Sequence, residues 1–167
     1  MNQCCAGLDA QVADTMQRYK RLPRVSGSMA DKLALVKTFL GKIGIKMKVT
    51  ADGKLFREGS FLFALCANAP VYGGGYISAP GADITDGELN CVTIDTIKRR
   101  QVIGLLPLYK KGEHEKIKEC NKGMCKSFEF EAEKPIPVSL DGEIIHTKSF
   151  KCEILEKAIN FALPAEI

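Results

Sequence analysis

The chain has 167 residues, of which 46% are hydrophobic and 26% charged, and its formal net charge is +4. This size and composition are ordinary for a globular domain with its own core, and no apolar run approaches the ~18 residues that span a bilayer. The charge is too mild, and the basic residues too little interleaved with aromatic ones, to indicate nucleic-acid binding. A faint attraction to anionic lipid stays open. We expect a single domain over residues 1–167.

The sequence contains seven cysteines, an odd number, and four of them lie in apolar or alternating stretches where cysteine acts as a small hydrophobe. Cys120 and Cys125 are five apart without a second matching pair, so their spacing does not favour a zinc site. We therefore expect reduced thiols in a cytoplasmic protein.

The first quarter of the chain predicts one strand and two helices. Residues 2–6 indicate a short buried strand, and apolar residues at helical spacing then continue from Leu8 to Tyr19. Ser28 is a suitable N-cap for a second helix, which Gly41 and Gly44 end. This second helix carries one apolar stripe, which consists of Met29, Leu33, Val36, Leu40 and Ile43.

Beyond residue 44 the apolar period changes from helical to two, which predicts strands. Residues 45–50 alternate, Asp52-Gly53 is a hairpin signal, and a short returning strand precedes a more buried one at 60–68. The later expected elements are a strand at 89–95, a helix from 97 to Pro107 with a basic tail to Lys111, and strands at 127–132, 136–140 and 150–154. The pattern predicts a strand-rich α+β domain with two or three helices, and it lacks the βαβ alternation of a nucleotide-binding sheet.

A glycine-rich run at 68–75 ends in three successive glycines, which permit close backbone approach to a ligand or a neighbouring segment. A simple flexible turn is the equal alternative. No lysine follows in P-loop spacing, so a Walker-type phosphate loop is excluded.

The acidic loop at 82–89 places three carboxylates around a glycine, an arrangement that suits a hard cation such as Mg²⁺. Its spacing is not that of an EF-hand, and solvated loop acids are the favoured reading from the residues alone.

Asp141-Gly-Glu143 forms a tight turn between strands, where a rigidly held carboxylate can act as a base or as a metal or ribose ligand. A plain hairpin turn is the favoured alternative. His114, in a charged stretch with no apparent nucleophile, is expected to be a surface histidine.

Taken in chain order, these segments resemble the lipid kinase superfamily of diacylglycerol and sphingosine kinases. The opening Asn2–Asp9 is similar to the start of the second domain in that family. The other matching segments are Asn68–Gly75, Ala79-Pro80, Ala82–Leu89, Gly112–His114 and Asp141–Glu143. The similarity covers nearly the whole chain, and the ordered set is more specific than any one motif.

The resemblance implies the β-sandwich-like C-terminal domain of the diacylglycerol kinase and NAD kinase-like superfamily. In such enzymes the active site lies between this lipid-side domain and an N-terminal domain whose Gly-Gly-Asp-Gly-Thr loop holds ATP. That N-terminal domain is absent from this chain, so the chain alone is expected to be inactive.

Carried over by the resemblance, Asp141 is the general base and Glu143 a ligand on the nucleotide or Mg²⁺ side. The resemblance further implies a structural Mg²⁺ site at Asp83, Asp86 and Glu88 and a cleft-shaping role for Asn68, Gly73, Gly74 and Gly75.

The expected function is that of an ATP- and Mg²⁺-dependent lipid kinase that phosphorylates the hydroxyl of diacylglycerol or a related lipid. Its expected partners are the lipid, its own ATP-binding domain and, transiently, the membrane surface. Basic residues at 98–100 and 110–111 flank Leu105 and Leu106, which would suit an interfacial contact, although a solvated face on a core-packed helix is at least as plausible. The alternatives are a non-catalytic lipid-binding or regulatory module and a relative that phosphorylates a soluble substrate, as NAD kinases do.

Overall fold

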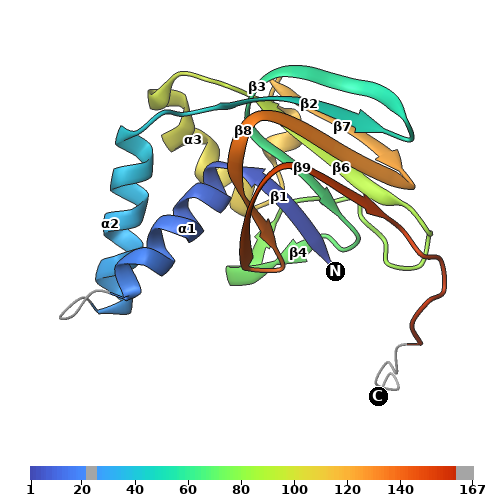
Figure 1. The fold of residues 1–167 in the computed structure, drawn as a ribbon, viewed down its shortest axis with the longest axis horizontal. Helices are drawn as coiled ribbons and strands as arrows, with labels where there is room; N and C mark the ends of the chain where they lie inside the picture. The colour runs from blue at the N-terminus through green and yellow to red at the C-terminus, as the bar shows by residue number, and fades with distance from the viewer. Residues whose placement is uncertain (22–25, 161–167) are drawn as a thin grey trace.

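Most strands of the protein join one large antiparallel sheet, as the computed structural model shows for residues 1–21 and 26–160 (Figure 1). Seven strands belong to this sheet, and β9 pairs with β8 at its side. Their bounds are β1 Gln3–Gly7, β2 Ile45–Ala51, β3 Lys54–Ala67, β6 Leu89–Asp95, β7 Cys120–Cys125, β8 Ser127–Leu140 and β9 Glu143–Glu153. A separate two-stranded ribbon consists of β4 (Val71–Tyr72) and β5 (Tyr76–Ile77). With three α-helices in the described residues, the protein has the strand-rich α+β fold that the sequence predicts.

Strands β3 and β8 are long, and each changes partner along its length. The first half of β3 pairs with β2, and its second half pairs with β1, where Cys66 lies opposite Cys4. In the same way β8 pairs first with β2 and then with β1, where Leu140 lies opposite Cys4. Consequently β1 is held on both edges, and the backbone pairing closes on itself around β1, β3, β2 and β8.

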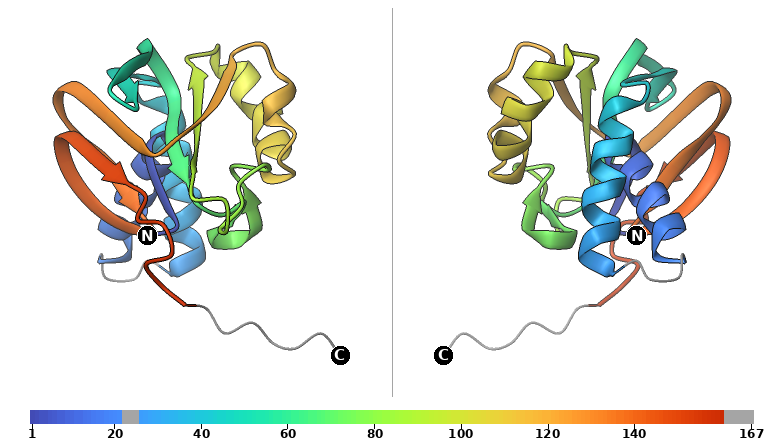
Figure 2. Two further views of the ribbon diagram at one scale, coloured as in Figure 1. Left: turned by 90° about the vertical axis from the view of Figure 1, so that its right-hand side faces the viewer. Right: turned by 90° about the vertical axis from the view of Figure 1, so that its left-hand side faces the viewer.

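The core has two parts because β3 is buried on both faces between Phe61 and Ala67. One part lies inside the curved sheet, where Phe61 packs with Phe128 and Phe130. The other lies under α3 (Arg99–Lys110), where Phe63 stacks on Tyr109 with ring centroids 4.9 Å apart. Figure 2 shows α3 and the β8–β9 hairpin on opposite sides of β3. Burial on both faces explains the continuous apolar run of this strand.

Helix α1 (Leu8–Lys20) leaves β1 directly at Gly7, whose φ is 140°. A Cβ atom at this position would lie 2.3 Å from the Leu62 carbonyl oxygen, so only glycine allows the strand to turn into the helix here.

Helix α2 (Gly27–Leu40) departs from the expectation in two respects. Its N-cap is Ser26, whose Oγ accepts a hydrogen bond from the Met29 amide, whereas Ser28 lies inside the first turn. Four residues of the expected stripe, Met29, Leu33, Val36 and Leu40, are exposed, whereas Ile43 lies beyond the helix and packs against the core under α3. The buried positions of α2 are Ala34 and Thr38, and α1 is its main neighbour.

Several element boundaries also differ from the expected ones. Strand β3 is continuous, and β8 is one strand with an irregular register between Glu131 and Ile136, where Pro135 cannot donate to the ladder. Strand β7 was not expected, and α3 continues past Pro107 to Lys110. Among the described helices, none is both long and apolar enough to cross a membrane.

Candidate functional site

Asp141 lies at the tip of the tight turn between β8 and β9, with φ 48°. Its carboxylate accepts hydrogen bonds from the backbone amides of Asn2 at 2.8 Å and Gln3 at 2.7 Å. The side chain is therefore fixed against the first strand, while the residue as a whole stays exposed to solvent.

Asn2 joins two of the predicted site residues at this corner. Its amide donates to Asp141, and its carbonyl accepts a hydrogen bond of 2.8 Å from the Asn68 amide. Its side-chain amide donates to the Val71 carbonyl at 3.2 Å. The corner exists because β1 pairs with both β3 and β8, which brings the end of β3 and the β8–β9 turn together.

Asn2 itself was not singled out from the sequence as a site residue. The available signal was its place at the head of the segment that matches the family. Asn68 adds a feature of its own, because its buried Oδ1 has no hydrogen-bond partner among the described residues. An acceptor left unpaired in this way is available to a ligand donor or a water molecule.

Glu143 is the first residue of β9 and pairs in register with Leu140. Its side chain is exposed, and within the described part of the chain no hydrogen bond or ion pair holds it. The structure thus places Glu143 beside Asp141 on the same turn and leaves it open to solvent.

The three glycines form a short 3-10 turn, Gly73–Gly75, between β4 and β5. Gly75 has a φ of 76°, which favours glycine, and a Cβ at Gly73 or Gly75 would meet nothing within 4 Å. The run therefore borders open space, so no neighbouring segment of the described chain explains the absence of side chains there.

The carboxylates of the acidic loop bind their own loop. Asp83 accepts hydrogen bonds from the hydroxyl and the amide of Thr85, which lower the pKa of Asp83 below its ordinary value. Asp86 accepts one from the Glu88 amide at 2.8 Å. Nowhere in residues 1–21 and 26–160 do three or more acidic, histidine or cysteine side chains gather as a metal site would require. The predicted Mg²⁺ site at Asp83, Asp86 and Glu88 therefore stays a prediction, without converging carboxylates in support.

His114 is not on the surface, contrary to the expectation. It is fully buried against Tyr109, with ring centroids 4.8 Å apart, and both ring nitrogens lack hydrogen-bond partners among the described residues. Burial lowers the pKa of His114 below its ordinary value, and the nearby Glu115 carboxylate opposes this shift. The charged neighbours in the sequence concealed a residue whose ring packs in the core.

A further polar group, the half-buried Asp9, connects α1 to the β4–β5 ribbon. Its carboxylate accepts hydrogen bonds from the Cys5 thiol at 2.9 Å and, at 3.4 Å, from the Tyr72 hydroxyl. Burial raises the pKa of Asp9, and burial together with the Asp9 charge raises the pKa of Tyr72. This network fixes Tyr72 immediately before the glycine run.

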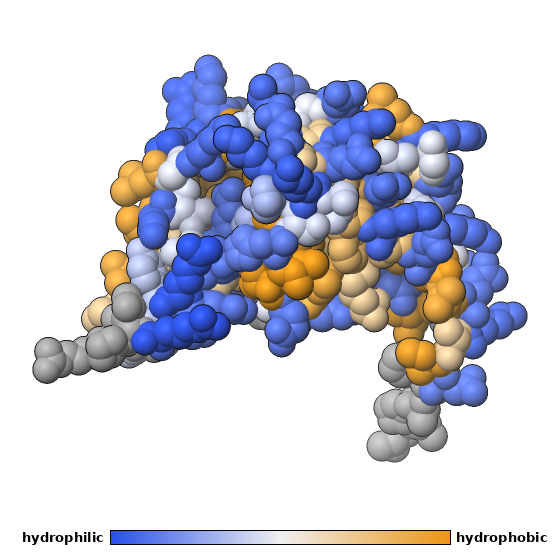
Figure 3. Space-filling model, in the orientation of Figure 1, coloured by the Kyte–Doolittle hydropathy of each residue, from blue (hydrophilic) through white to orange (hydrophobic). Residues whose placement is uncertain are grey.

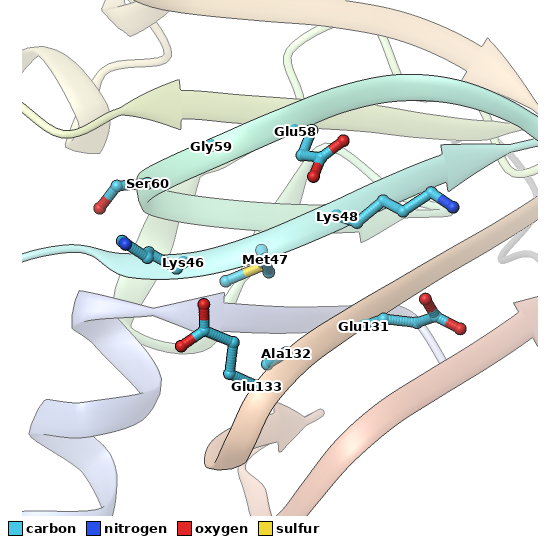
Figure 4. A pocket seen from close by; sticks show the side chains of 9 residues that line it. All are labelled: Lys46, Met47, Lys48, Glu58, Gly59, Ser60, Glu131, Ala132 and Glu133. Carbon is cyan, nitrogen blue, oxygen red and sulfur yellow. The ribbon is translucent and has the colours of Figure 1, made fainter.

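A groove of about 580 Å³ lies elsewhere, on the face formed by β2, β3 and β8 (Figure 4). Lys48 stands between Glu58 and Glu131 in the strand register, so charges of opposite sign alternate across this face. Cross-strand charge pairing of this kind stabilises a sheet surface. None of the predicted site residues lines the groove, and we assign the candidate site to the Asp141 corner instead.

Comparison with known proteins shows the family of the chain. Residues 2–163 match the family described as the YegS C-terminal NAD kinase beta sandwich-like domain. A relative from Shewanella frigidimarina, named "Probable lipid kinase YegS-like", is 30% identical over 164 residues, which cover 98% of this chain and 52% of the relative. A protein of the same name from Stenotrophomonas maltophilia is 28% identical, with the same two coverages. The chain thus spans about half the length of these curated relatives.

Two solved structures from Bacillus anthracis share the fold. One, described as a candidate diacylglycerol kinase, has a TM-score of 0.65 at 20% identity. The match covers 93% of this chain and 49% of the chain in that structure. The other, described as a diacylglycerol kinase, has a TM-score of 0.55 at 16% identity, with coverages of 93% and 46%. The fold is that of the β-sandwich-like domain in diacylglycerol kinase-type proteins. The chain belongs to the YegS C-terminal domain family, whose relatives are named as lipid kinases.

Proposed function

We propose that this chain is the lipid-side half of an ATP-dependent kinase that phosphorylates the hydroxyl of diacylglycerol or a related lipid. Family membership and the names of the relatives support a lipid kinase. The observation that carries the proposal to particular residues is the meeting of Asp141 and Asn68 on the backbone of Asn2. Two segments that carry the family resemblance, far apart in the sequence, thereby form one corner of the molecule.

In the proposed reaction Asp141 accepts the proton of the lipid hydroxyl as that oxygen attacks the γ-phosphorus of ATP. The bond from the γ-phosphorus to the bridging oxygen breaks, and ADP leaves. The hydrogen bonds from Asn2 and Gln3 keep the carboxylate in place during proton transfer. ATP and its Mg²⁺ ion are held mainly by a preceding ATP-binding domain, with Glu143 facing them from this side, so residues 1–167 alone should be inactive. Such a protein works in the cytoplasm and visits the membrane that contains its substrate.

A specific observation supports the alternative, a non-catalytic lipid-binding module. Asp52 has the same local structure as Asp141: both begin Asp-Gly turns, with φ 50° and 48°, and both accept two backbone amides. The amides bound by Asp52 are those of Lys126 and Ser127, far from the candidate site. The geometry of Asp141 is therefore also compatible with a purely structural role.

Asp52 provides the matched control that separates these possibilities. We would measure phosphate transfer from ATP to diacylglycerol by the full-length protein that carries this sequence, by its Asp141→Asn and Asp52→Asn variants, and by residues 1–167 alone. Each substitution should cost a similar ~1 kcal/mol of stability, because each weakens two amide hydrogen bonds. Only Asp141→Asn should lose transfer, by about 100-fold or more, as expected for removal of a general base.

Equal activity in the two variants would refute the base assignment. No transfer to any lipid by the full-length protein, together with retained lipid binding, would favour the non-catalytic module.

A further inference from the structure

The outer face of α2 exposes a continuous apolar stripe. Met29, Leu33, Val36 and Leu40 are 50%, 45%, 56% and 67% exposed. They recur at the spacing of one helical face, opposite the buried Ala34 and Thr38. Hydrophobic side chains that gather in this way, without cover from the described chain, indicate a surface that meets something apolar.

Lysines border this stripe on both sides. Lys32 lies four residues before Val36, and Lys37 four residues after Leu33, so the two cations fall on opposite flanks of the stripe. Lys32 is exposed, and the Lys37 ammonium lies 5.4 Å from the centre of the Tyr19 ring. Lysines so placed can lay their methylene stems along apolar surface while the charged ends stay in a polar layer.

Further positive charge gathers where α2 ends. The Arg99 guanidinium donates to the carbonyls of Leu40 at 3.1 Å and Gly41 at 2.7 Å. The exposed Lys42 follows directly. The sequence of α2 contains one acidic residue, Asp31. An apolar stripe flanked and followed by cations is complementary to an anionic lipid surface, whose headgroups are negative and whose interior is apolar.

We propose that the outer face of α2 docks on an anionic membrane surface, with the apolar stripe at the headgroup boundary and Lys32, Lys37, Lys42 and Arg99 among the phosphates. In Figure 3 hydrophobic residues mark the left-hand edge of the molecule, where Figure 1 places α2. The inference deepens the proposed lipid kinase function by naming the surface that contacts the membrane in which the substrate lies. Its biological role rests on the proposed function, whereas membrane binding itself does not.

Helix α3 does not fit this role, although its basic residues suggested it. Leu105 is buried in the core and Leu106 is half-buried, so α3 turns its apolar side inward and presents a solvated basic face. A preceding domain is also poorly placed to cover the apolar stripe of α2. It would join at Met1, and Figure 1 shows the N-terminus well separated from α2 across the molecule.

The test is flotation of the full chain with phosphatidylcholine vesicles, with and without phosphatidylglycerol, in the absence of ATP. The chain should float only with the anionic vesicles, and binding should weaken as salt rises. The double variant Leu33→Gln/Val36→Gln should bind about tenfold less tightly or worse, because two apolar side chains no longer leave water. Lys32→Glu/Lys42→Glu should weaken binding to anionic vesicles to a similar degree.

Matched controls use equally exposed residues far from α2. Leu55→Gln and Lys54→Glu, at the β2–β3 turn, should bind as the unchanged chain does. Thermal unfolding of every variant checks that the fold is retained.

Two results would overturn the proposal: vesicle binding that the α2 variants leave unchanged, or absence of binding together with a dimer that Leu33→Gln/Val36→Gln converts to monomer. The second result would assign the stripe to a second copy of the chain. Phosphate transfer to a dispersed short-chain diacylglycerol is measured separately. Because residues 1–167 alone should be inactive, this assay uses the full-length protein that carries this sequence. If that protein shows no transfer while the chain floats, the result counts against the kinase function alone.

Discussion

Burial of His114 should make the stability of the protein depend on pH in a defined window. In the unfolded chain a histidine takes up its proton near pH 6.5, whereas burial lowers the pKa of His114 in the folded protein. The unfolded state therefore binds more protons below pH 6.5, and the free energy of unfolding should fall as the pH decreases, by at most about 1.4 kcal/mol per pH unit for one proton. Above about pH 6.5 the histidine is neutral in both states, so the stability no longer depends on its protonation.

Urea unfolding of the protein and of His114→Gln between pH 5 and pH 8 measures this effect. The variant cannot take up the proton, so its stability should change less between pH 6.5 and pH 5. An identical slope in both proteins would show that other groups cause the acid sensitivity.

At the scale of single residues, the sequence predicted two residues of the Asp141 corner but not the contacts that bring them together. Asp141 and Asn68 were singled out by residue type and family resemblance, and the structure brings them together. Asn2 binds Asp141 and Asn68 through its backbone, which almost any residue type could do, so its residue type did not predict these two bonds. His114 was misjudged because burial follows from the packing of Tyr109 and not from the charged neighbours in the sequence.

At the scale of elements, the N-terminal cap of α2 permits a direct test. Ser26→Ala removes the acceptor for the Met29 amide and should cost about 0.5–1 kcal/mol, at the low end of capping effects because the bond is 3.4 Å long. Ser28→Ala, inside the first turn, should be neutral or slightly stabilising, because alanine favours helix. Urea midpoints of the two variants make the comparison, and a larger loss in Ser28→Ala would contradict the cap assignment.

Elements with one clear apolar period along their length were predicted well. Elements whose burial changes along their length were not. The alternation at 45–50 and the apolar spacing after Leu8 depend on local contacts and gave β2 and α1. Strand β3 was divided in two because its first half is exposed or half-buried, whereas its second half is buried on both faces. The stripe on α2 has the correct helical period, but periodicity shows only that a helix has an apolar side and not what that side meets.

At the scale of the whole molecule, the cysteines should behave as core residues. Five of the seven are buried and two are half-buried, and all are free thiols. Burial raises the pKa of Cys5 and raises that of Cys120 to about 11, so few thiolates are available to react near neutral pH. Within the buried set the Cys91 and Cys125 sulfurs are 2.8 Å apart, and the hydrogen bond from Cys91 lowers the pKa of the Cys125 thiol.

A chromogenic thiol reagent at pH 8 should therefore react slowly with the native protein. After denaturation it should react with all seven thiols. Cys120→Ser should leave six reactive thiols in denaturant and should slow the native reaction further, because Cys120 is one of the two half-buried thiols. Rapid reaction of several thiols in the native protein would contradict this packing.

The overall topology was beyond the sequence alone. A strand-rich α+β domain followed from composition and period, but the exchange of partners by β3 and β8 depends on contacts between distant parts of the chain. Family resemblance supplied the sandwich-like architecture that no local pattern contained.

The double pairing of β1 has a consequence during protein synthesis. Strand β1 is synthesised before both of its neighbours: one edge finds residues 63–67, but the other must wait for residues 138–140 before it is covered. An uncovered strand edge has unpaired backbone amides and carbonyls, which can pair with another polypeptide chain. One edge of β1 therefore stays uncovered while the residues between its two partner segments are synthesised, and the corner at Asp141 forms only after that residue has emerged.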